Sequence, residues 1–109
     1  GMPAGELKHG TLSLVTDNTP VVGICPFDNT YMDMLTNLHE VKSRGAKIIA
    51  VTNEPDRLFD YTLSIPNVDP IFYPLVCIIP TQLLAYQTAI SKGLNPDRPR
   101  NLAKSCTVE

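Results

Sequence analysis

Two residues suited to proton transfer and covalent chemistry lie near opposite ends of this 109-residue chain. His9 lies in the sequence GELKHG near the amino terminus, and Lys104 lies in the sequence NLAKS near the carboxyl terminus. An imidazole titrates near neutral pH. A lysine amine forms an imine with a ketone when burial or nearby positive charge lowers its pKa. The pair indicates acid–base and Schiff-base chemistry; the alternative interpretation is an ordinary loop histidine and a solvated tail lysine.

Three further side chains are candidates for chemistry. Arg98 and Arg100 are close enough to Lys104 in the sequence to supply positive charge to its amine, or to bind a phosphate group. Cys25 ends an apolar run, where a thiol is either a nucleophile or a core residue, and core packing is the favoured interpretation. The three cysteines form no CxxC pair, so we expect reduced thiols, no disulfide framework and no metal site. No motif for a bound cofactor is present.

Composition limits the class of protein. A length of 109 residues corresponds to one domain. The net charge of −2, with nine basic and eleven acidic residues, does not form a clustered basic face, so we expect no nucleic-acid partner. No apolar run reaches the 18 or more residues of a membrane span, and the start resembles no signal peptide. Gly1 before Met2 is typical of a purification-tag remnant. We therefore expect a cytoplasmic globular domain.

Three apolar runs predict the strands that position these residues. Residues 21–25 form a continuous apolar run without alternation, residues 47–52 predict a second buried strand, and residues 61–65 predict a third, shorter strand that Pro66 ends. Such runs are typical of parallel strands covered on both faces. A loop with one short helix at 55–59 is expected between the second strand and the third.

Helical periodicity appears in two places. Apolar residues recur at helical spacing over residues 31–44, with capping residues before them and Gly45 after them. Residues 70–92 also have helical spacing, but Pro74 and Pro80 predict a kink or two helical pieces. Residues 3–10 are expected to form a loop, residues 11–15 a short turn, and residues 94–109 an extended tail.

The order of these elements predicts an α/β fold with a three-layer parallel sheet. The helices at 31–44 and 83–92 are expected to pack on it. Three strands are few for such a sheet, and nothing in the chain is predicted to pair with the outer edge of the 21–25 strand. An unpaired apolar edge is a template for another chain, so we expect a homodimer or a longer parent chain.

Three blocks of sequence resemble a known family. The blocks AGELKHG, QLLAY and RNLAKSCTVE, in this order, are similar to the C-terminal end of the glutamine–fructose-6-phosphate aminotransferase family. The resemblance extends from Met2 to the last residue. It implies that residues 1–109 are the C-terminal part of a flavodoxin-like SIS (sugar isomerase) domain, with residues 94–109 as a catalytic tail.

The resemblance also implies roles for three residues. A lysine matching Lys104 forms an imine with the C2 carbonyl of fructose 6-phosphate. A histidine matching His9 opens the sugar ring and reaches the site of the neighbouring subunit. The backbone around Ala103 lines the sugar site. The implied ligands are the phosphosugars fructose 6-phosphate and glucosamine 6-phosphate.

The chain departs from the family in two mild ways, because Thr11 replaces a common proline and Cys106 a common valine. The family's glutaminase domain, its phosphate-binding loop and its glutamate base have no counterpart in this sequence, so we expect the isolated chain to be inactive. The alternative hypothesis is a stand-alone phosphosugar-binding SIS module without catalysis. The presence of both Lys104 and His9 favours the enzyme.

Overall fold

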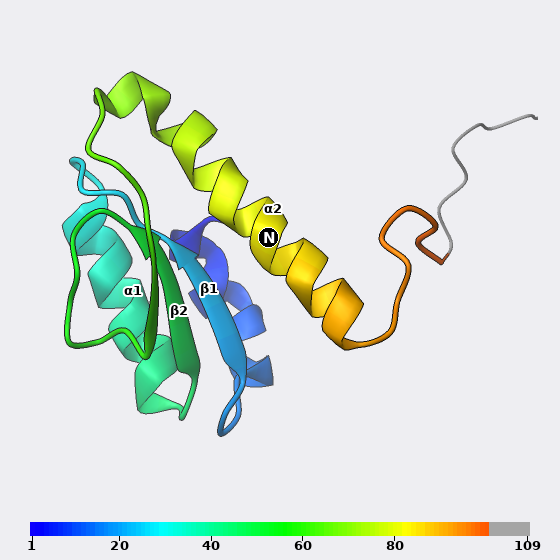
Figure 1. Cartoon of the computed structure of the whole chain (residues 1–109). Coiled ribbons are helices and arrows are strands. Elements are labelled where there is room, and N and C mark those ends of the chain that lie inside the picture. The colour runs from blue at the N-terminus through cyan, green and yellow to red at the C-terminus, as the bar shows by residue number, and fades with distance from the viewer. Residues whose placement is uncertain (101–109) are drawn as a thin grey trace, which may run out of the picture.

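The computed structural model describes residues 1–100 and contains a three-stranded parallel sheet with helices on both faces (Figure 1). The strands are β1 (Pro20–Ile24), β2 (Lys47–Thr52) and β3 (Tyr61–Ser64), in the order β1-β2-β3. Gly23 is paired with Ala50 across the first two strands. The predicted strands and their parallel order are confirmed, with shifts of one residue at some ends.

The first helix, α1 (Tyr31–Ser43), follows the predicted apolar spacing and ends where glycine was expected to end it. Gly45 has a φ of 89°, a left-handed conformation that glycine adopts without strain. Its N–H donates to the carbonyl of Lys42, and the N–H of Ala46 donates to that of Val41. This is the hydrogen-bond pattern of a Schellman motif. At the other end, the expected side-chain cap is absent from Thr30.

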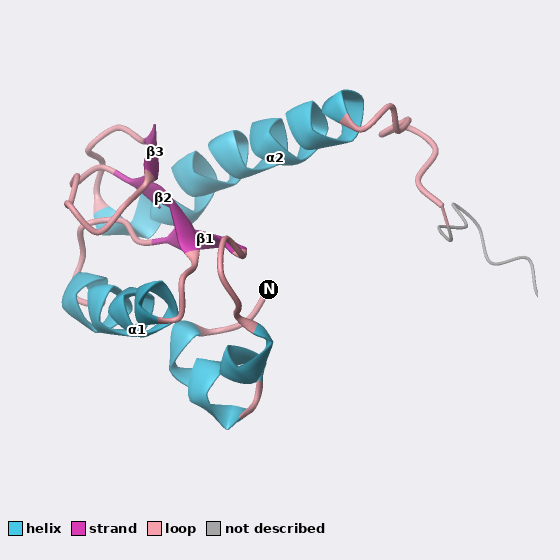
Figure 2. Cartoon of the chain, turned by 90° about the horizontal axis from the view of Figure 1, so that it is seen from below, coloured by secondary structure: helices cyan, strands magenta, loops and turns pink. Residues whose placement is uncertain are grey.

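The sheet separates two apolar cores, one on each face. Figure 2 shows α1 and the amino-terminal helical segment on one side of the sheet and α2 on the other. Leu38 and Val41 of α1 pack with Ile48 and Ala50 of β2 on one face, which also carries the short 3₁₀ helices η1 (Ala4–His9) and η2 (Thr11–Leu14). On the other face, four buried residues from β2, the position directly after β3 and the last helix form a smaller core: Val51, Ile65, Tyr73 and Cys77. The predicted three-layer α/β arrangement is therefore confirmed.

The last helix, α2 (Tyr73–Ser91), follows a short 3₁₀ turn, η3 (Pro70–Phe72), and is continuous. Pro74 lies in the first turn, where a missing N–H costs no helical hydrogen bond, and the helix continues through Pro80. The predicted break within the helix is therefore wrong. The prediction that residues 83–92 pack on the sheet is also wrong, because the buried residues of α2 are Tyr73 and Cys77 in its first half.

Two local predictions differ from the structure. Residues 3–10 were expected to form a loop, but residues 4–9 form η1, with its apolar Leu7 packed against the core around α1. The expected short helix at 55–59 is a turn in the structure. There the Asp56 carboxylate accepts the N–H of Leu58, a local hydrogen bond that stabilises a turn instead of a helix.

Within residues 1–100, one helical segment, Pro70–Ser91, is long and apolar enough to cross a membrane by length and composition. Its mean hydropathy is 1.2. Core helices of soluble proteins also pass this test but are mostly buried, whereas 11% of this window is buried in the structure.

Asp60 links α1 to the start of β2. Its carboxylate accepts the N–H of Ile48 at 2.7 Å, pairs with Lys42 and lies 3.6 Å from the amine of Lys47. The Lys42 hydrogen bond, followed by that of Ile48, lowers the pKa of Asp60 from 3.8 to about 2. A lowered pKa adds stability above the unfolded-state pKa, and this stability is lost as pH falls toward 2.

We therefore expect the free energy of unfolding to decrease between pH 4 and pH 2, and Asp60→Asn to remove part of that decrease. Urea titrations at pH 7, 4 and 2.5 measure it. Asp33→Asn, on the exposed face of α1, is the matched control. Identical pH dependence in Asp60→Asn and wild type would show that the carboxylate does not contribute in this way.

Candidate functional site

Loops from three elements meet at the carboxyl edge of the sheet, and Asn53 joins them. Its side-chain oxygen accepts the N–H of Phe27 at 2.8 Å. Its side-chain nitrogen donates to the Tyr73 hydroxyl at 3.1 Å and to the side-chain oxygen of Asn67. The Tyr73 hydroxyl in turn donates to the carbonyl of Phe27 at 3.4 Å. Asn53 therefore ties the loop after β1 and the segment before α2 to the end of β2.

We expect Asn53→Ala to reduce the free energy of unfolding by about 1–3 kcal/mol, because it leaves partly buried hydrogen-bonding groups without partners. Asn37→Ala is the matched control, since the Asn37 amide donates only to a carbonyl one turn earlier on the exposed face of α1. Denaturant titration measures both variants. An equal, small loss in the two variants would contradict the linking role of Asn53.

A hollow of about 370 Å³ lies between the end of β1 and the start of α2. Its lining is mainly apolar, with Ile24, Pro26, Cys77 and Ile78 among the contributors, and Asp28 is its one charged residue. The Asp28 carboxylate already accepts the N–H and the hydroxyl of Thr30, at 2.8 and 2.7 Å. A phosphate group prefers cationic and N–H donors. This hollow therefore does not have the chemistry of a phosphosugar site.

The two described cysteines are core residues. Cys25 is 2% exposed, and burial raises the pKa of its thiol to about 11. Burial also raises the pKa of Cys77. A buried thiol with a raised pKa remains protonated at neutral pH and is therefore a poor nucleophile, which supports the core-packing interpretation of Cys25. Among the described residues, no group of three or more histidine, cysteine or acidic side chains could hold a metal ion.

His9 ends η1 and is exposed to solvent. Its segment is held in place by its neighbours, since Leu7 packs against the core, Leu12 is buried, and the Lys8 amine lies 3.1 Å from the Glu40 carboxylate of α1. Within residues 1–100, no hydrogen bond or ion pair joins the imidazole of His9 to the network around Asn53. The imidazole is free to meet a ligand or another chain.

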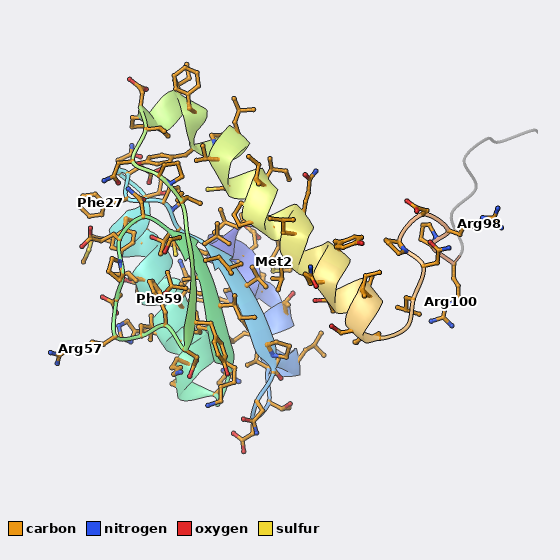
Figure 3. All side chains as sticks on the ribbon, viewed as in Figure 1. Met2, Phe27, Arg57, Phe59, Arg98 and Arg100 are labelled. Carbon is orange, nitrogen blue, oxygen red and sulfur yellow. The ribbon has the colours of Figure 1, made fainter. Side chains whose placement is uncertain are left out.

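The predicted lysine site lies only partly within the structure. Lys104 and Ala103 are outside the described residues, so their placement relative to His9 is untested. Arg98 and Arg100 follow α2 and are exposed, far from the sheet (Figure 3). They contribute, with Gly93 and Leu94, to a hollow of about 790 Å³ at the end of that helix. Two guanidinium groups give this hollow the charge that an anion requires.

Asn53 is not among the residues predicted from the sequence. The signal was present, because Asn53 directly follows a buried parallel strand, and ligands of open α/β sheets bind outside the carboxyl ends of the strands. Phe27 and Asp28 likewise come shortly after β1.

The parallel sheet with helical layers on both faces defines an α/β domain of the layered, parallel-sheet class. Residues 1–92 match the SIS domain, and the chain belongs to the SIS domain family.

Similar sequences point to one group of enzymes within this family. The chain is 50% identical to the glutamine–fructose-6-phosphate aminotransferase (isomerizing) of Pyrococcus horikoshii and 48% identical to that of Thermococcus kodakarensis. Each match covers 100% of this chain but only 19% and 18% of those proteins. The chain thus spans about a fifth of their length.

A solved structure also relates the chain to an aminotransferase of this kind. The chain superposes on the C-terminal domain of glucosamine-fructose-6-phosphate aminotransferase from Francisella tularensis with a TM-score of 0.79 and 38% identity. The match covers 89% of this chain and 29% of that one. The predicted resemblance is confirmed, and the chain is homologous to the C-terminal part of these aminotransferases.

Proposed function

We propose that this chain forms part of the isomerase site of an enzyme that makes glucosamine 6-phosphate and glutamate from fructose 6-phosphate and glutamine. The observation that carries the proposal is the 48–50% identity over the whole chain to aminotransferases of that name. In this proposal residues 1–109 are the C-terminal part of a SIS domain, and residues 94–109 are its catalytic tail.

Lys104 is proposed to carry the covalent step. Its uncharged amine adds to the C2 carbonyl of open-chain fructose 6-phosphate and releases water to form an imine, which is an electron sink for the proton shift between C1 and C2. The amine must be deprotonated to add. The exposed guanidinium groups of Arg98 and Arg100, six and four residues away from Lys104 in the sequence, supply the positive charge that favours a neutral amine nearby.

His9 is proposed to open the ring, and the backbone around Ala103 to line the sugar site. An exposed imidazole on a fixed 3₁₀ helix suits the first role, because ring opening needs a group that both takes and gives a proton near pH 7. The exposure of His9 supports a contribution to the site of a neighbouring subunit. We accordingly propose a cytoplasmic homodimer.

We expect the isolated 109-residue chain to be inactive, because it spans about a fifth of its relatives. The test is a chimera in which this chain replaces the matching segment of the Pyrococcus horikoshii aminotransferase. The chimera should form glucosamine 6-phosphate from fructose 6-phosphate and glutamine. A folded chimera that hydrolyses glutamine but forms no amino sugar would contradict the proposal and favour a sugar-binding role without catalysis.

A further inference from the structure

The backbone directly after His9 has a conformation that glycine alone adopts readily. Gly10 ends η1 and precedes η2, with a φ of 144° and a ψ of −48°. A residue with a side chain rarely adopts a φ in this range. Among the described residues, a Cβ added at Gly10 would meet no atom within 4 Å. Glycine is therefore required here for its backbone conformation and not for room inside the chain.

Hydrogen bonds fix the peptide that follows this conformation. The carbonyl of Gly10 accepts the N–H of Ser13 at 3.0 Å and the Ser13 hydroxyl at 2.6 Å. Ser13 belongs to η2, whose Leu12 is 6% exposed and packs in the core around α1. Two hydrogen bonds thus tie Gly10 to a residue beside the buried anchor of η2.

The chain on the other side of His9 has an anchor of its own. Leu7 packs against the same core, and the Lys8 amine lies 3.1 Å from the Glu40 carboxylate of α1. Exposed ion pairs contribute little by themselves, so Leu7 is the main anchor of η1. His9 therefore lies at a corner between two anchored 3₁₀ helices, with its backbone held and its imidazole exposed.

We propose that Gly10 is a positioning residue for His9. The inference rests on the proposed role of His9 in opening the sugar ring. A general acid–base group must lie within hydrogen-bond reach of the proton that it moves, and a displacement of about 1 Å can cost about 10²-fold in rate. A side chain at residue 10 strains the corner, and rotation of the peptide between residues 9 and 10 relieves the strain. This rotation moves the imidazole away from the position that the two helices set.

A purely structural role of Gly10 makes a different prediction. A variant that only loses folded enzyme turns over every substrate more slowly by the same factor. A variant that displaces His9 slows the step that needs His9, which is ring opening. The ratio of the rates with cyclic and open-chain substrates therefore separates the two roles.

Gly10→Ala in the full-length chimera tests the proposal, with Gly5→Ala as the matched control. Gly5 lies in η1 and also has open space around it, but its φ lies outside the range of Gly10. Gly10→Ala should lower kcat with fructose 6-phosphate about 10- to 100-fold and leave the rate with an open-chain analogue within about threefold. Gly5→Ala should leave both rates within about twofold of the wild type. Glutamine hydrolysis and thermal unfolding check that each variant is folded.

Two further variants keep the test sharp if Gly10→Ala folds poorly. In a chimera that already carries His9→Ala, Gly10→Ala should cause less than about twofold further loss with fructose 6-phosphate, because no imidazole is left to position. Ser13→Ala removes the hydroxyl that donates to the Gly10 carbonyl, and should cause a loss of about two- to fivefold with the cyclic substrate alone. Ser43→Ala is its control, since the Ser43 hydroxyl donates to a carbonyl three residues earlier at 2.7 Å, at the end of α1.

Three outcomes would overturn the inference while leaving the role of His9 intact. The first is a Gly10→Ala enzyme as fast as Gly5→Ala with fructose 6-phosphate. The second is an equal loss with cyclic and open-chain substrates. The third is an undiminished further loss in the His9→Ala background, which would show that Gly10 acts without His9. A His9→Ala enzyme with no defect specific to the cyclic substrate would instead contradict the proposed role of His9, and this inference with it.

Discussion

Replacement of Lys104 by arginine should abolish amino-sugar formation in the full-length chimera. Arginine keeps the positive charge but remains protonated at working pH, so it cannot add to a ketone as a neutral amine. Since the loss removes the nucleophile itself, the rate of glucosamine 6-phosphate formation should fall by at least about 10³-fold. A colorimetric or mass-spectrometric assay of glucosamine 6-phosphate measures it.

Two controls separate this chemical effect from misfolding. Glutamine hydrolysis should remain measurable in Lys104→Arg, because it occurs at a different site of the parent enzyme. Lys92→Arg, at the exposed end of α2, should leave both activities within about twofold of the wild type. A Lys104→Arg enzyme that isomerises fructose 6-phosphate at the normal rate would contradict the assignment of Lys104.

Replacement of His9 by alanine should slow the reaction by about 10²–10⁴-fold, the usual contribution of a positioned general acid–base group. The defect should shrink when an open-chain analogue of the sugar is supplied, because that substrate needs no ring opening. His39→Ala is the matched control, since His39 is also exposed and lies on α1. An equal defect with cyclic and open-chain substrates would contradict a ring-opening role.

The two variants also test whether His9 acts across the subunit interface. Unfolding and refolding an equal mixture of the His9→Ala and Lys104→Arg chimeras should produce mixed dimers. In each mixed dimer one site combines an intact Lys104 from one subunit with an intact His9 from the other. Random pairing then restores activity at about a quarter of all sites. A mixture as inactive as its components would place both residues in one subunit.

Much of the fold was predictable from local pattern. The central strand β2 is buried on both faces because helices cover both sides of the sheet, and its run of apolar residues shows this in the sequence. The end of α1 was predictable because Gly45 occupies a left-handed position, in which any added side chain would also collide with Asp17.

The behaviour of α2 was not predictable from its pattern alone. Proline content predicted a break, but a proline in the first turn costs no hydrogen bond, and the helix continues past the second one. Apolar periodicity predicted that residues 83–92 pack on the sheet. Periodicity identifies an apolar face but not what covers it, and here the sheet ends before the second half of the helix is covered.

The residues of the candidate site were only partly predictable from the sequence. His9 and Lys104 were identified because their chemistry and surrounding motifs are distinctive. Asn53 was missed because an asparagine after a strand has many roles, and its importance depends on residues 14 to 26 positions away that only the fold brings together. Its contacts belong to tertiary structure, which local sequence does not encode.

Reductive trapping of the sugar tests the central proposal most directly. The wild-type chimera is incubated with fructose 6-phosphate and borohydride, which reduces an imine to a stable secondary amine, and the modified peptide is identified by mass spectrometry. The isolated 109-residue chain should label weakly or not at all. In the chimera, we expect a hexose phosphate adduct on Lys104; an adduct on another lysine, or none in an enzyme that still forms glucosamine 6-phosphate, would contradict the role proposed for Lys104.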